Sequence, residues 1–171
     1  MKRNIVMFII LVISLVLPST VFHYWSWNGI KPDLVMLWVI YIALHHRPAE
    51  GLTYGFIAGL IADFYFGRYI GMYTITLALV AFLISTLQQR WYRENIPLTI
   101  VLVFSATFMG QMIVSLLANI AGLNWYLDNV LPMIVGISVY NTILVPITYP
   151  LISRSFNKGV LKPESKYERS F

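Results

Sequence analysis

The sequence lacks cysteine altogether and contains few charged residues. Charged side chains make up 11% of its 171 residues, with 12 Lys or Arg against 7 Asp or Glu. Without cysteine, these residues hold no disulfide, thiolate metal site or cysteine nucleophile. With so few polar groups, the chain cannot cover the surface of a water-soluble globule. The net charge of +5 does not indicate a nucleic-acid partner, because the basic residues stand between apolar runs and not on one soluble face.

Apolar residues fill the remainder of the chain, at 58% hydrophobic content and a mean hydropathy of +0.73. A helix needs about 20 apolar residues to cross the roughly 30 Å of hydrocarbon in a bilayer. We therefore predict an all-α, polytopic membrane protein of about six transmembrane helices. Residues 1–152 form its single six-helix transmembrane domain, and residues 153–171 form a basic, polar cytoplasmic tail. The predicted spans are residues 4–22, 32–44, 51–66, 70–87, 97–121 and 131–152.

Three of these spans have features beyond apolarity. The first follows Lys2 and Arg3 and is also typical of a secretory signal peptide, but no small-x-small cleavage site follows it, so we interpret it as a retained helix. The second is short and opens with Pro32 and Asp33, residues typical of a helix first turn. In the sixth, two prolines at positions 146 and 150 each remove a backbone donor, and we expect them to kink or end the helix.

The positions of the basic residues predict the orientation, because cytoplasmic loops retain Lys and Arg. Ten of the 12 stand on one side of the predicted spans, and only Lys31 and Arg68 stand on the other. The protein is therefore expected in a bacterial inner membrane, with both termini on the cytoplasmic side. Aromatic residues in the opposite loops, at positions 24, 25, 27, 125 and 126, are typical of an outer interfacial belt. The ten are Lys2, Arg3, Arg47, Arg90, Arg93, Arg154, Lys158, Lys162, Lys166 and Arg169.

Small residues recur with a regular spacing in the third span. Glycine stands at every fourth position from 51 to 59, and Asp63 continues the same register. On a helix this spacing produces a gently winding stripe along which another helix can approach closely. The stripe packs this chain's own bundle or meets another chain, and the sequence leaves both alternatives open. The candidate packing or interface residues are Gly51, Gly55, Gly59, Asp63, Gly67 and Gly71.

Asp63 is the acidic residue that stands well inside an apolar run. A carboxylate at the centre of a bilayer costs at least about 2.5 kcal/mol, so it must be buried, paired or near the surface. Because Asp63 lies toward the outer end of its span, pairing with Arg68, a helix-capping role or exposure to an outer vestibule all satisfy this requirement. We favour a structural role for it over proton or ion transport. For Asp33 we favour the position at the start of the second helix.

Residues for catalysis or metal binding are scarce. His45 and His46 are adjacent, hence about 100° apart on a helix, and they are unsuited to bind one metal together. We expect lipid headgroups to solvate both. The sequence has no phosphate-binding loop, no serine nucleophile elbow and no evident acid/base pair. We therefore predict that the protein is not an enzyme and has no cofactor.

The opening Pro32-Asp33-Leu34 of the second span and the pattern Gly51, Gly55, Phe56, Gly59, Leu60, Asp63, Gly67, Gly71 resemble those of the rod shape-determining MreD family. The length, the early apolar helix and the basic end of the chain are also similar. This resemblance implies membership of the machinery for lateral peptidoglycan synthesis. It implies MreC as the direct partner, and MreB, RodA and a transpeptidase as indirect partners. It also implies a six-helix fold similar to the substrate-binding subunits of energy-coupling-factor vitamin transporters.

Two functions follow from these observations. The first is a membrane scaffold that binds MreC, surrounded by lipid and with a homodimer as an open alternative. The second is a substrate-binding subunit for a vitamin or other small molecule. A carrier needs converging donors and acceptors inside an outward cavity. The intramembrane polar groups are few, chiefly Asp63, Gln111, Asn119 and Asn141, so we favour the scaffold.

The predicted topology can be tested with reporter fusions. Fusions after Arg93 and after Phe171 should report the cytoplasm, and one near Asn124 should report the exterior, because the basic residues divide ten to two. Alkaline phosphatase and a fluorescent protein, which are active on opposite sides of the membrane, provide the paired readout. A cytoplasmic signal at Asn124 would overturn the assignment of the spans.

Overall fold

The structure is a computed structural model that describes residues 2–20, 29–67, 70–91, 95–123 and 127–158. Within these ranges the chain forms six helices and no β-strand. Each helix coincides with one predicted span, although the ends differ by a few residues, so the predicted all-α fold is confirmed. The helices are α1 (Lys2–Thr20), α2 (Leu34–Ala43), α3 (Pro48–Phe66), α4 (Met72–Trp91), α5 (Ile96–Ile120) and α6 (Leu127–Lys158).

Among the described residues, two helices are long and apolar enough to cross a membrane: α5, and the part of α6 from Val130 to Phe156. Shorter apolar segments lie in α1, α2 and α4. Large apolar side chains are also exposed on the outer faces of α1 and α6, for example Phe8 and Ile143. A surface of this kind suits contact with lipid, where apolar exposure has no cost.

The expectation that α6 could end at its prolines is wrong. The helix contains Pro146 and Pro150 and continues through both to Lys158. Each proline removes a single backbone donor, so the neighbouring backbone bonds still hold the helix together. Side chains add further bonds nearby, since the Thr148 hydroxyl donates to the carbonyl oxygen of Leu144 at 2.7 Å.

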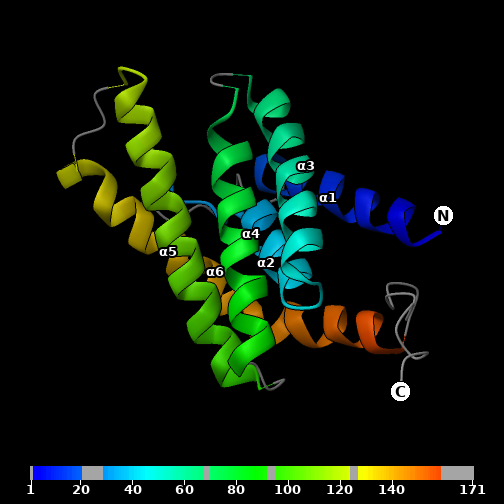
Figure 1. The fold of residues 1–171 in the computed structure, drawn as a ribbon. Coiled ribbons are helices and arrows are strands. Elements are labelled where there is room, and N and C mark those ends of the chain that lie inside the picture. Colours follow the sequence, from blue (N-terminus) through cyan, green and yellow to red (C-terminus); the bar gives the residue numbers. More distant parts are fainter. Residues whose placement is uncertain (1, 21–28, 68–69, 92–94, 124–126, 159–171) are drawn as a thin grey trace.

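The short helix α2 lies at the centre of the bundle (Figure 1). Nine of its ten residues are buried, and it packs against all five other helices. These five pack in the order α1, α3, α4, α5, α6 around it, and no Cα atom of α1 lies within 8 Å of one in α6. The described helices therefore form an open ring around α2, with the opening between α6 and α1.

The length of α2 leaves space inside this ring. Ten residues span about 15 Å, half of the roughly 30 Å of a bilayer core. The longer α3, α4 and α5 stand side by side and extend well beyond it, whereas α1 and α6 run across them (Figure 1). The ring thus has α2 at its centre along one half of its height. Beyond the first residue of α2, the other half has no central helix.

Helices α3 and α4 share the most extensive contact in the bundle. The first three glycines of the stripe lie against α4. A Cβ atom added at Gly55 would lie 2.5 Å from the carbonyl oxygen of Leu77, and one at Gly59 would lie 2.5 Å from that of Tyr73. A Cβ at Gly51 would meet the side chain of Ser85. The two backbones approach this closely because no side chain separates them.

Gly67 and Gly71 lie outside this contact. They have positive φ angles of 64° and 109°, and a Cβ on either would meet no atom within 4 Å. Gly67 ends α3 in the left-handed conformation, with its amide bonded to the Asp63 carbonyl, as glycine commonly does after a helix. These two glycines therefore belong to the turn between α3 and α4.

Leucine at Gly55 or Gly59 should destabilise the protein by forcing α3 and α4 apart. Overpacking typically costs about 1–3 kcal/mol, and here the obstacle is backbone that cannot rotate away. Thermal unfolding of the purified protein in detergent measures the loss. Thr53→Leu is the matched control, because Thr53 is exposed on the same helix. Equal melting temperatures for the glycine variants and the control would contradict the close contact.

Candidate functional site

Asp63 lies in the last turn of α3 and holds the start of α4. Its side chain is 2% exposed. The carboxylate accepts bonds from the backbone amides of Gly71 at 2.8 Å, Tyr73 at 2.9 Å and Thr74 at 2.9 Å, and from the Thr74 hydroxyl at 2.6 Å. The amides of a first helical turn have no partner within their own helix, and a carboxylate there also faces the positive end of the helix dipole.

These four bonds explain how a carboxylate is accommodated in an apolar run. Three of the bonds end on Oδ2 and one on Oδ1, so both oxygens of the carboxylate are hydrogen-bonded. Asp63 thus occupies a capping position, on α4 and not on its own helix. Arg68, the partner considered from the sequence, lies outside the described residues. Thr74 was not recognised from the sequence, although a threonine just after a glycine turn is a usable signal for a helix start.

Asp33 caps α2 and ties three helices together. Its Oδ1 accepts the Met36 amide at 2.9 Å, and its Oδ2 accepts Nε2 of Gln111 on α5 at 2.7 Å. Its backbone oxygen accepts Nδ2 of Asn141 on α6 at 3.0 Å. Pro32 precedes it and is buried. Gln111 and Asn141, two of the few intramembrane amides in the sequence, therefore both converge on the start of α2.

A cavity of about 960 Å³ lies beyond this end of α2, where the ring has no central helix. All six helices or their ends contribute to its wall. Most of the lining is apolar, including Leu15, Val35, Phe66, Val114 and Ile137. The polar side chains on the wall are Ser14, Ser19, Lys31, Asp33, Asp63, Tyr73 and Gln111.

Most of these polar groups are already bonded to the protein. Asp63 accepts four bonds at the start of α4, and the Tyr73 hydroxyl bonds the side chain of Gln111. The Ser14 hydroxyl donates to the carbonyl oxygen of Ile10 at 2.8 Å. Lys31 is half-buried at the wall. The cavity is therefore large and mainly apolar, and the described residues leave few polar groups for a ligand.

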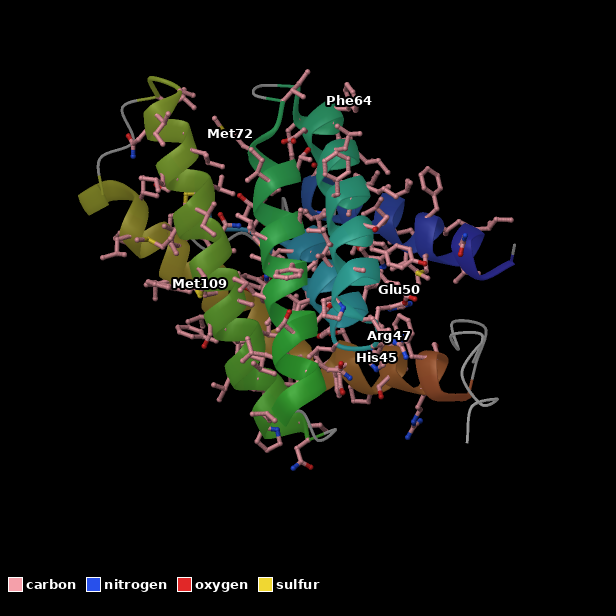
Figure 2. The ribbon with its side chains drawn as sticks, viewed as in Figure 1. His45, Arg47, Glu50, Phe64, Met72 and Met109 are labelled. Carbon is pink, nitrogen blue, oxygen red and sulfur yellow. The ribbon has the colours of Figure 1, made fainter. Side chains whose placement is uncertain are left out.

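The histidines lie at the opposite end of α2, away from the cavity. Figure 2 shows His45 and Arg47 beside α6, in the lower right of the view, and Phe64 and Met72 toward the top. The expectation of solvation by lipid headgroups is wrong for His46, which is 5% exposed and bonds the Ile42 carbonyl through Nδ1 at 3.0 Å.

The reason for this burial is the packing of α6 over the end of α2. The ring of Phe156 stacks on that of His45 with centroids 4.4 Å apart and meets that of His46 edge-on at 5.7 Å. In the described part of the chain, no three His, Asp or Glu side chains gather as metal ligands.

The chain matches a known family over nearly all of this architecture. The family model of the rod shape-determining protein MreD matches residues 1–155. The matched region includes the glycine stripe, both capping aspartates and the cavity. Neither the curated proteins nor the solved structures contain a significant match.

Substitutions of Asp63 should destabilise the protein in a graded way. Asn keeps one acceptor oxygen and the shape but loses the charge, so the melting temperature should fall moderately. Leu leaves all four donors without a partner, at about 1–3 kcal/mol for each buried group, and should cause a larger fall. Glu50→Gln removes an exposed carboxylate from the same helix and serves as the control. A melting temperature for Asp63→Leu equal to that of the control would refute the capping role.

Proposed function

This chain belongs to the family of the rod shape-determining protein MreD, and on that premise we propose that it is a non-enzymatic scaffold that binds MreC in the cell-elongation complex. Members of this family are membrane proteins with a role in rod shape, and this chain shares that role. Through MreC the scaffold reaches MreB, RodA and a transpeptidase and supports lateral peptidoglycan synthesis.

The proposed location is the bacterial cytoplasmic membrane, with both termini on the cytoplasmic side. The division of basic residues, ten against two, supports this orientation. The start of α1 and the end of α6 lie on the same side of the molecule, as an even number of spans requires (Figure 1). In this orientation the cavity faces outward, because it lies beyond the end of α3 and the start of α4.

The observation that carries the scaffold proposal is the use of buried polar groups inside the chain. Asp63 accepts four bonds from Gly71 and the first turn of α4, and Gln111 bonds both Asp33 and Tyr73. A carrier for a polar vitamin requires several free donors and acceptors that converge on its ligand. Here such groups are used to hold the helices of one bundle in place, which suits a rigid platform for other proteins.

The glycine stripe bears on where a partner can dock. In the structure, α4 of the same chain covers Gly51, Gly55 and Gly59. We therefore propose that the stripe acts on partners indirectly, by fixing α3 and α4, and that MreC docks on another face.

A carrier related to energy-coupling-factor subunits is the second candidate, and the outward cavity of about 960 Å³ favours it. The two functions predict different contents for the purified protein. A stoichiometric vitamin that is retained through purification and released by Asp63→Asn would establish the carrier. Its absence, together with normal vitamin uptake in cells that carry Asp63→Asn, supports the scaffold.

The scaffold function predicts a loss of rod shape when the bundle is disturbed. Gly59→Leu or Asp63→Leu, as the sole copy in a rod-shaped bacterium, should give rounded cells and less MreC recovered with the protein. Membrane insertion should persist, as measured by membrane fractionation and blotting. Asp63→Asn should give a milder defect.

Thr53→Leu and Glu50→Gln should leave both cell shape and MreC recovery unchanged, because both side chains are exposed on the same helix. Rod shape at normal protein levels in both Gly59→Leu and Asp63→Leu would argue against the proposed function.

A further inference from the structure

Two opposite charges line the outward cavity side by side. Lys31 and Asp33 precede α2 in a non-helical segment, and both side chains contribute to the cavity wall. In an extended segment, residues two apart point to the same side. Among the described residues, Lys31 forms no ion pair or hydrogen bond with any side chain. As far as the described side chains go, the cavity therefore presents an unpaired ammonium group and a carboxylate two residues apart.

The carboxylate of Asp33 still has capacity for one more donor. It accepts bonds from Met36 and Gln111, and the Val35 amide also faces it. That leaves one of about four acceptor positions. Asp63, on the same wall, already accepts four bonds from the protein. Asp33 accepts fewer, which leaves it more capacity to bind a cation.

In the described part of the chain, the wall of the cavity is open between α1 and α6. Residues of α1 and of α6 border the cavity, yet these two helices do not pack against each other. Both helices carry exposed apolar side chains, for example Val16 on α1 at 41% and Met133 on α6 at 45%, and Met133 also lines the cavity. A molecule can therefore place a polar group in the cavity and leave a hydrocarbon chain in lipid.

We propose that the cavity binds the headgroup of a zwitterionic phospholipid, phosphatidylethanolamine, with its acyl chains leaving between α1 and α6. Its phosphate faces Lys31, and its primary ammonium donates to Asp33. Phosphatidylglycerol lacks the cation, and the quaternary ammonium of phosphatidylcholine lacks N–H donors, so neither satisfies both residues. The volume of about 960 Å³ also accommodates the glycerol and the first part of the chains. This lipid site goes beyond the scaffold function and does not depend on MreC.

Lipid binding to the purified full-length protein tests the proposal. Native mass spectrometry after exchange with equal amounts of the three phospholipids measures how much of each is retained. Phosphatidylethanolamine should be retained about tenfold more than the other two, because a hydrogen bond to a charged group has about that effect or more. Lys31→Gln should lower its retention by a similar factor.

Asp33→Asn should abolish the preference for phosphatidylethanolamine over phosphatidylglycerol, whereas it preserves the helix cap, since asparagine caps as well as aspartate. The matched controls are Arg154→Gln and Glu50→Gln, which remove exposed charges outside the cavity. Both should retain the lipid like the unchanged protein. If Asp33→Asn does not fold, the retention of phosphatidylethanolamine by Lys31→Gln tests the proposal on its own.

Two results would overturn the proposal. The first is equal retention of the three phospholipids, or retention that Lys31→Gln leaves unchanged. The second concerns soluble glycerophosphoethanolamine, which carries the headgroup without chains. If it binds the protein tightly and vesicles of phosphatidylethanolamine do not displace it, the cavity binds a soluble zwitterion and not a lipid.

Discussion

The shortness of α2, which spans about half of a bilayer core, is the constraint on which the rest of the structure depends. Because α2 contacts every other helix and begins in the middle of the bundle, its first turn would leave unpaired amides in an apolar interior. Asp33 bonds the Met36 amide of that turn, and Gln111 and Asn141 then attach α5 and α6 to Asp33. The same helix start that joins these elements also leaves the cavity beyond it. The cavity is thus a consequence of the fold and not an accident of loose packing.

Asp63, the second buried carboxylate, bonds the amides at the start of α4, which would otherwise be unpaired. Asp63 reaches from α3 to the first amides of α4, while Gly55 and Gly59 let the two backbones come together. The two features depend on each other: the carboxylate reaches its donors because the glycines allow the approach, and its four bonds hold the approach in place. Helix association in lipid relies on such packing and hydrogen bonding, since apolar burial gives little net drive there.

The bonding of the polar groups is the reason why we propose a scaffold for a protein that contains a large cavity. A carrier keeps its intramembrane polar groups available for the substrate, whereas most of the buried polar side chains described in this chain join its own helices. Lys31, and the capacity that Asp33 keeps beyond its bonds to Met36 and Gln111, lie beside the opening between α1 and α6. This position suits an amphipathic lipid better than a soluble solute. A lipid in the cavity and a protein partner outside it are compatible, because they use different surfaces.

The sequence by itself determined the features that depend on local composition and spacing: the helical class, six helical segments, the stripe from Gly51 to Gly59, and Asp33 at a helix start. It also pointed to Asp63 as a buried carboxylate that needed partners. Only the tertiary structure decided which donors serve Asp63, because Gly71, Tyr73 and Thr74 become its neighbours only when α3 and α4 close. The cavity, the open ring and the burial of His46 likewise arise from contacts between distant segments. No local pattern in the chain records such contacts, because each depends on the length and tilt of several helices at once.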